Sequence, residues 1–391
     1  MARSTRPRGA RKTTGKLAQV AMLDERLTQT LIALAGVPSV SGQEDAVRQW
    51  LAEKLEKYEL APTTDAAGNL IVRVPAHPNA RDDEPPLLLN AHMDRVPPGL
   101  AHRPVLRDGA LYSDGATNLG ADDSAGIAVI LHTLDELRAS NLSHPPLLLL
   151  FTVGEEVGLI GAKAFDPTPW GAREGIVFDN AGEAGVVVTH AATYIAFDAL
   201  LRGSGGHPGK RLEGTTSAIE IFHRAAYPVG SLDDDTSRVS IGRIEGGSAR
   251  NAVPRELWAL GEARTLLEGD ARVRLLAEIA AAFTAAANTL GGSAEVSFDP
   301  HCDGYTVDED EPLLRAWMRA QTTLGITPRT MTTFIGSDAS ALRAHTRVFT
   351  VSTGAMDEHT SDEWIAIAPL AAVIRTAVAL LSTYQADAAD V

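Results

Sequence analysis

Cysteine, long apolar runs and positive charge are scarce in this sequence, and each shortage excludes a class of protein. The single cysteine, Cys302, cannot form an internal disulfide, so we expect a reducing compartment, the cytoplasm. No apolar run is long enough to span a bilayer, so no membrane association is expected. Acidic residues outnumber Lys and Arg by 50 to 35, and the formal charge of −15 argues against nucleic-acid binding.

The first twenty residues differ in composition from the rest of the chain. Residues 1–20 are rich in arginine and lysine and contain almost no apolar residues. They lack the apolar stretch of a secretory signal. We therefore expect a disordered basic arm. A tether to an anionic surface is the alternative, and no feature elsewhere in the sequence supports it.

The remaining pattern predicts two domains, as the length of 391 residues also suggests. Apolar strands at 87–91 and 147–153 alternate with helical segments, which is typical of an α/β fold with a mostly parallel sheet covered by helices. This catalytic domain would comprise residues 21–192 and 303–391. Between them, residues 193–302 show the order β-α-β-β-α-β, which predicts an inserted α+β domain of ferredoxin-like arrangement.

The segment from Ser41 to Glu44 has the pattern of a capping box. In such a box a serine and a glutamate three positions later bond reciprocally to the backbone where a helix starts. Apolar residues then recur at helical spacing from Val47 to Tyr58. We therefore expect a helix that Ser41 caps.

Acidic residues and histidines stand where predicted strands end. His92 and Asp94 follow one strand, Glu155 and Glu156 follow another, and Asp179 follows a third. The carboxyl ends of parallel strands lie at one edge of a sheet, where α/β proteins bind their ligands. Because a buried carboxylate is costly without a partner, this edge is predicted to bind metal or substrate.

Two metal ions about 3.5–4 Å apart need a bridging carboxylate and about two further ligands each. Zinc binds imidazole and carboxylate groups. Five residues supply such a set: His92, Asp122, Glu156, Asp179 and His359. Glu155 is then left as a base, and Asp94 is placed to accept the second N–H of His92. We therefore predict two Zn²⁺ ions, with Co²⁺ or Mn²⁺ as alternatives.

Together these segments resemble the dinuclear-zinc metallopeptidase family of peptidase T, aminoacylase, acetylornithine deacetylase and glutamate carboxypeptidase. The similar segments, in the family's order, are His92-Met93-Asp94, residues 120–126 (GADDSAG), residues 154–158 (GEEVG), Asp179 and residues 358–363 (EHTSDE). The Asp-Asp-Ser-Ala-Gly sequence is most similar to the peptidase T branch. The resemblance implies a zinc-exopeptidase type of fold, with the inserted domain serving as a lid and dimerisation domain.

The resemblance also implies a role for each residue. His92 and Asp179 would hold one zinc ion, Glu156 and His359 the other, and Asp122, followed by a cis peptide bond, would bridge them. Glu155 would take a proton from a water between the two metals and pass it to the leaving amine.

Three residues of the inserted domain resemble substrate contacts of the family. His207, in the glycine-rich segment 203–209, would stabilise the oxyanion, and in a dimer it would do so in the partner's active site. Asn251, in the segment 246–254, would contact the substrate. Arg264 could bind a substrate carboxylate or form a surface ion pair, and both readings stay open.

One loop departs from the peptidase T pattern. That branch carries Arg-Gly-Gly-Thr-Asp where this chain has Phe-Ile-Gly-Ser-Asp at 334–338. Gly336, Ser337 and Asp338 match and are predicted to bind substrate, whereas the arginine and the first glycine are missing. The departure leaves the zinc chemistry intact and puts strict recognition of tripeptides in doubt.

These observations predict a zinc-dependent exopeptidase that hydrolyses amide bonds of small peptides. A tripeptidase-like aminopeptidase, dimeric through the inserted domain, is the favoured form. An N-acyl-amino-acid deacylase or a carboxypeptidase of the same family is the alternative, and a requirement for a free α-amine separates them. A non-catalytic binding protein on this scaffold is a remote alternative, since Glu155 and every predicted ligand are present.

Overall fold

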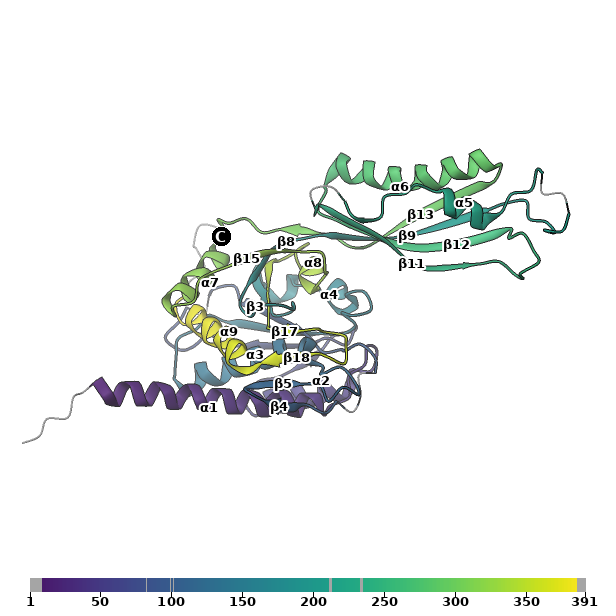
Figure 1. Cartoon of the computed structure of the whole chain (residues 1–391). Helices are drawn as coiled ribbons and strands as arrows, with labels where there is room; N and C mark the ends of the chain where they lie inside the picture. The colour runs from purple at the N-terminus through teal and green to yellow at the C-terminus, as the bar shows by residue number, and fades with distance from the viewer. Residues whose placement is uncertain are drawn as a thin grey trace, which may run out of the picture. The chain divides into compact units, whose positions relative to one another are not determined.

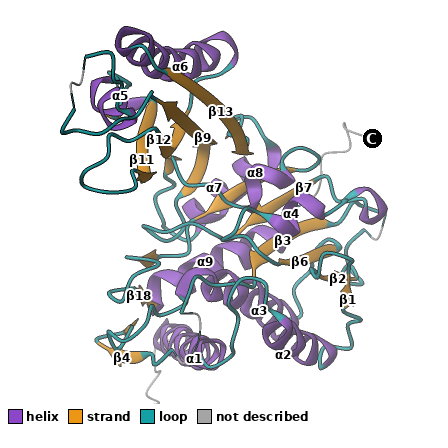
Figure 2. Ribbon diagram, turned by 90° about the vertical axis from the view of Figure 1, so that its right-hand side faces the viewer, coloured by secondary structure: helices purple, strands orange, loops and turns teal. Residues whose placement is uncertain are grey.

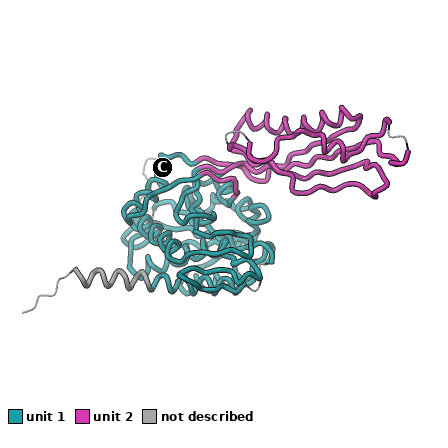
Figure 3. Tube along the Cα trace, in the orientation of Figure 1, with its two compact units in different colours: residues 1–189, 307–331, 337–391 teal, residues 190–306, 332–336 magenta. Residues whose placement is uncertain are grey.

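The computed structural model describes residues 9–81, 83–98, 100, 102–210, 213–232 and 235–384, with the side chains of residues 9–21 excepted. The chain forms two compact units (Figure 3). Unit 1 contains residues 1–189, 307–331 and 337–391, and unit 2 contains residues 190–306 and 332–336. The predicted inserted segment, 193–302, falls within unit 2, and the sequence pattern gives no sign of the short return segment 332–336.

The larger sheet has nine strands, in the order β1-β2-β6-β3-β7-β16-β8-β14, with β15 paired to β8. They are β1 (Thr63–Thr64), β2 (Leu70–Val74), β3 (Leu87–His92), β6 (Leu147–Thr152), β7 (Glu174–Val177), β8 (Val187–Ala191), β14 (Tyr305–Thr306), β15 (Thr330–Thr333) and β16 (Arg347–Val351). The central strands β6, β3, β7 and β16 run parallel, as predicted. Every residue of β3 and β6 is buried, because both faces of the sheet are covered and side chains on either face are core.

Helices cover both faces of this sheet (Figures 1 and 2). On one face lie α1 (Gly9–Ala35), α3 (Ala121–Ala139) and α9 (Ile367–Leu381), and on the other lie α4 (Ile160–Ala164) and α8 (Asp338–Leu342). Unit 1 also contains α2 (Asp45–Glu56), α7 (Pro312–Thr323) and a 3₁₀ turn at Thr168–Trp170.

The expected disordered arm overlaps the start of α1. Residues 1–8 lie outside the described residues, but the bounds of α1 include residues 9–20. The helix therefore begins within the segment that was expected to be disordered.

A small antiparallel sheet completes unit 1. Its strands, in the order β17-β18-β5-β4, are β17 (Ala355–Met356), β18 (Trp364–Ala366), β5 (Ala110–Tyr112) and β4 (Val105–Arg107). Strands of two or three residues are too short to show periodicity, so the sequence did not indicate this sheet. Its importance is that β17 and β18 flank the loop that carries His359.

Unit 2 has an antiparallel sheet in the order β10-β11-β12-β9-β13. Its elements are β9 (Thr193–Arg202), α5 (Ala218–Arg224), β10 (Gly230–Ser231), β11 (Ser237–Gly246), β12 (Glu256–Thr265), α6 (Gly269–Leu290) and β13 (Ser293–Cys302). Apart from the short β10, both the chain order and the spatial order are those of a ferredoxin-like domain. Both helices lie on one face of the sheet (Figure 1).

Among the described helices, α6 is the one that is long and apolar enough to cross a membrane, by length and composition alone. This corrects the expectation that no run reaches that length, because the many alanines of α6 give its 18-residue window a mean hydropathy of 1.3. In the structure, Leu275, Ile279 and Phe283 on one side of α6 pack into the core of unit 2. The helix thus covers the sheet of its own unit.

Phe283→Ala should destabilise unit 2 by about 3–5 kcal/mol, because the ring is fully buried and its loss leaves a cavity. The centroid of Phe283 lies 5.1 Å from that of Tyr227 and 6.4 Å from that of Phe222. Amide hydrogen exchange in β9 and β12 would report the loss. Val273→Ala is the matched control, since Val273 lies on the same helix and is 64% exposed. Equal exchange protection in both variants would contradict this account of the core.

Candidate metal centre

The carboxyl ends of three parallel strands bring most of the predicted ligands together. His92 is the last residue of β3, the Glu155-Glu156 pair follows β6, and Asp179 follows β7. Because β3 pairs with both β6 and β7, the three strand ends are adjacent. The two remaining predicted ligands enter from elsewhere, Asp122 from the start of α3 and His359 from the loop after β17.

Asp122 lies between the two histidines. Its Oδ1 is 3.1 Å from Nε2 of His92, and its Oδ2 is 3.1 Å from Nε2 of His359. The same nitrogen of His359 is 2.9 Å from Oε1 of Glu156. Asp122 therefore presents one oxygen to each side, as a bridging carboxylate must. The peptide bond between Asp122 and Asp123 is cis, which confirms the expectation from the resemblance.

Two groups of potential ligands share Asp122. One comprises His92, Asp122 and Asp179, and the other comprises Asp122, Glu156 and His359. Within each group the ligand atoms lie within 4.8 Å of one another. A third group, His92, Glu155 and Glu156, places Glu155 beside the same atoms. Imidazole and carboxylate groups at this spacing fit two divalent transition-metal ions, and the shared aspartate fits a site that holds both.

Asp94 holds several residues of the site in place through hydrogen bonds. Its carboxylate is fully buried, and Oδ1 lies 3.3 Å from Nδ1 of His92, the arrangement predicted for a group that orients the imidazole. It also accepts the backbone amides of Glu155 at 2.9 Å and Glu156 at 3.2 Å. The hydroxyl of Ser41 donates to it at 2.7 Å. One carboxylate thus fixes His92 and both glutamates.

The predicted capping box at the start of α2 was wrong. The N-cap of α2 is Glu44, whose side chain makes no capping bond. Its carboxylate instead accepts the amides of Gly42 at 2.8 Å and Gly154 at 3.2 Å. Ser41 and Glu44 are therefore used to hold the loops at the site, and these tertiary contacts replace the local capping pattern.

Buried carboxylates of the site hold protons more tightly than usual. Burial raises the pKa of Glu155 well above its usual value, and the charge of Asp179 adds to this effect. Burial likewise raises the pKa of Asp179 and of Glu156. Like charges in a poorly solvated place cannot all ionise unless positive charge is added. A divalent cation would supply that charge and displace the protons.

The pKa values of the two histidines are also raised, but by hydrogen bonds to carboxylates and not by burial. Burial lowers the pKa of His92, but its hydrogen bonds with Asp122 and Asp94 outweigh burial and raise this pKa well above the usual value. Hydrogen bonds with Asp122 and Glu156 raise the pKa of His359 to about 10. In turn, and despite burial, the two imidazoles hold the pKa of Asp122 well below its usual value. Without metal, protons on the imidazoles balance the charge of this carboxylate.

The loop at 336–338, predicted to bind substrate, places its two polar side chains in internal contacts. Asp338 is buried and accepts the hydroxyl of Thr152 and, at 3.4 Å, the side-chain amide of Asn90. The hydroxyls of Ser337 and Thr350 lie 3.0 Å apart. Gly336 belongs to the segment counted with unit 2. Substrate binding by these three residues stays a prediction.

The other predicted substrate contacts lie in unit 2. Arg264 donates to the carbonyl of Phe334 at 2.9 Å and forms an ion pair with Glu262 at 3.0 Å, and its role in binding a substrate carboxylate stays a prediction. His207 and Asn251 are exposed, and Nδ1 of His207 accepts the amide of Gly209 at 3.1 Å.

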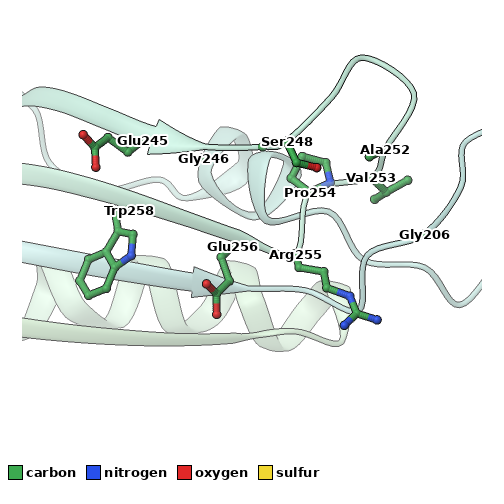
Figure 4. A pocket seen from close by; sticks show the side chains of 11 residues that line it. Gly206, Glu245, Gly246, Ser248, Ala252, Val253, Pro254, Arg255, Glu256 and Trp258 are labelled. Carbon is green, nitrogen blue, oxygen red and sulfur yellow. The ribbon is translucent and has the colours of Figure 1, made fainter.

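A pocket of about 670 Å³ lies next to the segments 203–209 and 246–254, which carry His207 and Asn251 (Figure 4). Its lining includes Gly206 and Ala252, the chain neighbours of His207 and Asn251, together with Trp258 and Glu256 of β12. Ligand binding in unit 2 would therefore have space available, and the roles of His207 and Asn251 stay predictions.

Two buried carboxylates of the site received no role from the sequence. Asp123 accepts the amide of His92 at 3.1 Å and that of Gly126 at 2.9 Å. A Cβ at Gly126 would lie 2.0 Å from the carbonyl oxygen of Phe178, so this close approach requires glycine. The second carboxylate, Glu363, accepts backbone amides just before Asp122. In the sequence, only its position four residues after the predicted ligand His359 could have indicated that Glu363 belongs to the site.

Comparisons with known proteins agree with this geometry. The model of Peptidase family M20/M25/M40 matches residues 88–383. The crystal structure of aminopeptidase PepT from Bacillus cereus is 31% identical, with a TM-score of 0.84 over 92% of this chain and 98% of that chain. A tripeptidase structure from Staphylococcus aureus is 28% identical, with a TM-score of 0.86 over the same shares.

Two curated relatives complete the comparison. Uncharacterized protein YqjE from Bacillus subtilis is 30% identical over 369 residues, which are 92% of this chain and 98% of that protein. A probable carboxypeptidase from Emericella nidulans is 30% identical over 255 residues, which are 56% of this chain and 58% of that protein. Relatives at this level of similarity therefore carry the names of both aminopeptidases and carboxypeptidases.

Protonated His359 should stabilise the metal-free protein at neutral pH but not in alkali. Its pKa is about 10 in the folded chain against 6.5 for an ordinary imidazole, so its stabilisation is complete below pH 6.5 and is lost as the pH rises to about 10. The difference in free energy of unfolding between wild type and His359→Gln, both with chelator, should shrink from pH 7 to pH 10. Urea denaturation would measure it, with the exposed His223→Gln as control. A constant difference over this range would contradict the prediction.

Proposed function

This chain is a metallopeptidase that belongs to Peptidase family M20/M25/M40, and we propose that it removes N-terminal residues from small peptides. The observation that carries the proposal is the position of Asp122 between His92 and His359, with Glu155 beside the same ligand atoms. This arrangement supports hydrolysis with two metal ions and a carboxylate base.

The ligand groups suggest how the metals would be shared. His92 and Asp179 would hold one ion, Glu156 and His359 the other, and Asp122 both. We propose zinc, with Co²⁺ or Mn²⁺ as alternatives, because the donors are imidazole and carboxylate. When bound, the metal pair supplies Lewis acidity that polarises the scissile carbonyl and favours ionisation of water.

Glu155 is the group that we propose to move the proton. Its backbone amide is held by Asp94, so the side chain extends from a fixed point toward the ligand atoms. The carboxylate takes one proton from the attacking water as the oxygen bonds to the carbonyl carbon. It returns that proton to the nitrogen as the C–N bond breaks, so water is consumed and no acyl-enzyme forms. A carboxylate beside the ligand atoms is placed to take and return a proton in this way.

The relatives support small peptides as substrates, whereas the loop at 334–338 limits how far their specificity can be extended to this chain. The two solved relatives named as an aminopeptidase and a tripeptidase share nearly the whole chain length. The loop at 334–338 lacks the arginine of the peptidase T pattern, so we do not extend the proposal to strict tripeptide length. Carboxypeptidase activity is the second candidate, because the similar protein from Emericella nidulans is named a probable carboxypeptidase.

We further propose a homodimer that forms through unit 2 and works in the cytoplasm. The dimer is motivated by His207, which is exposed and hydrogen-bonded within its own loop, as a residue that serves a partner's site would be in an isolated chain. The location is motivated by the single cysteine of the sequence, Cys302, which cannot form an internal disulfide.

Cleavage should require a free α-amine and bound metal. We expect the zinc-loaded protein to hydrolyse di-, tri- or tetrapeptides with free amines, and to leave the same peptides intact when they are N-acetylated. A chelator should abolish the activity, and added metal should restore it. Cleavage of acetylated compounds instead would assign the chain to the deacylases, and release of C-terminal residues would assign it to the carboxypeptidases.

Glu155→Gln should reduce kcat by about 10²–10⁴-fold while two metal ions remain bound, because only the proton acceptor is removed. Metal content by elemental analysis distinguishes this result from loss of a ligand. Full activity in the metal-loaded variant would exclude Glu155 as the base.

Complementation would test whether His207 serves the partner subunit. Glu155→Gln and His207→Ala should each be nearly inactive alone. Co-expressed, they should recover about a quarter of wild-type activity, since half of the dimers are mixed and one of their two sites is intact. Co-expression of Glu155→Gln with Asp122→Asn is the control, because both defects fall in unit 1 sites and no site is restored. No recovery in the first pair, or an active monomer in light scattering, would remove the dimer proposal.

A further inference from the structure

We propose that Glu363 is a positioning residue that holds Asp122 between the two histidines by binding the backbone just before it. The inference rests on the proposed dinuclear site. It gives a role to a carboxylate whose hydrogen bonds are to the main chain of residues 119–122.

Four backbone amides converge on the one buried carboxylate of Glu363. Oε2 of Glu363 accepts the amides of Leu119 at 2.6 Å and Gly120 at 2.8 Å. Oε1 accepts those of Ala121 at 2.8 Å and Asp122 at 3.1 Å. Glu363 is 0% exposed, so its charge is satisfied by these amides in place of water.

The backbone at this point is shaped to converge on an acceptor. Gly120 has φ of 72°, and Asp122 and Asp123 have non-helical dihedral angles although they fall within the bounds of α3. The N-cap residue, Gly120, has no side chain of its own that could accept these amides. The amides of four consecutive residues therefore point into one concave space, which Glu363 fills.

A buried arginine holds the other side of the same loop. Arg95 donates to Ser124 at 2.6 Å, to the carbonyl of Leu34 at 3.0 Å and to that of Val37 at 3.1 Å. A Cβ on Gly120 would lie 2.8 Å from Cδ of Arg95, so the guanidinium stem is in close contact with the loop. Glu363 and Arg95 thus both hold residues 119–124 in place.

The same chain segment supplies a ligand and its support. Glu363 follows His359 by four residues, and its own amide bonds the carbonyl of Thr360 at 3.3 Å. The carbonyl of Glu363 accepts the amide of Ser113 at 2.9 Å, which ties the segment to unit 1. A displacement of Glu363 would therefore alter the distance between Asp122 and His359, which decides whether one carboxylate can reach both metals.

Glu363→Gln tests the proposal because the change preserves shape and removes one of the two acceptor oxygens. We expect each metal to bind about 10–100-fold more weakly, the range found when groups that orient ligands are lost. Titration of the metal-free protein with Co²⁺, followed by its visible absorption, would measure this loss without reference to activity. In the metal-saturated enzyme, kcat should fall while KM changes little, since no substrate contact is removed.

Glu174→Gln is the matched control. Glu174 is also a buried carboxylate of unit 1, but it begins β7 and accepts Arg347 at 2.9 Å and the hydroxyl of Tyr384. Its loss should lower the free energy of unfolding and leave Co²⁺ binding unchanged. Wild-type Co²⁺ affinities in Glu363→Gln, or an equal weakening in Glu174→Gln, would overturn the proposal.

A second measurement keeps the proposal testable if Glu363→Gln does not fold. In the metal-free wild type, the amides of residues 119–122 should exchange with solvent as slowly as those of β3. Rapid exchange there would show that Glu363 does not hold the loop. Failure of the wild type to bind two Co²⁺ ions would instead count against the proposed function itself.

Discussion

The crowding of carboxylates at one edge of the sheet is the constraint on which the site depends. Glu155, Glu156, Asp179 and Asp122 lie with two imidazoles where the parallel strands end. Their mutual repulsion is weakly screened in a buried place, so they can stay together only if protons or cations balance their charge. The raised pKa values of Glu155 and Asp179, and of both histidines, are the response of the chain without metal.

A second set of buried carboxylates, Asp94, Asp123 and Glu363, fixes the positions of the predicted ligands and accepts hydrogen bonds mainly from backbone amides. Asp94 accepts two amides from the Glu155-Glu156 pair, Asp123 accepts the amide of His92, and Glu363 accepts four from the loop before Asp122. Amide donors are fixed to the main chain and lose little side-chain entropy on bonding, unlike lysine or arginine. A chain with few basic residues can therefore bury several carboxylates at one site and still provide hydrogen-bond donors for them.

The sequence predicted the buried strands of unit 1 and the residues at their carboxyl ends. The apolar runs of β3 and β6 showed buried parallel strands, and the acidic residues and histidines after them pointed to the metal edge. Local patterns misled where a tertiary contact competed, as with Ser41, which looks like a helix cap and bonds Asp94. The function of Glu363 could not be seen, because its partners are amides about 240 positions away in the chain, which carry no side-chain signal.

The discontinuous course of unit 1 has a consequence for how the protein is made. Translation delivers His92, Asp122, the glutamate pair and Asp179 before unit 2, whereas His359 and Glu363 follow it. Until residues 359–363 leave the ribosome, Asp122 lacks one of its imidazole neighbours and the loop at 119–122 lacks the carboxylate that binds it. A nascent or truncated chain thus contains most of the acidic residues of the site but lacks His359 and Glu363. The order of synthesis therefore prevents an incomplete chain from hydrolysing peptides.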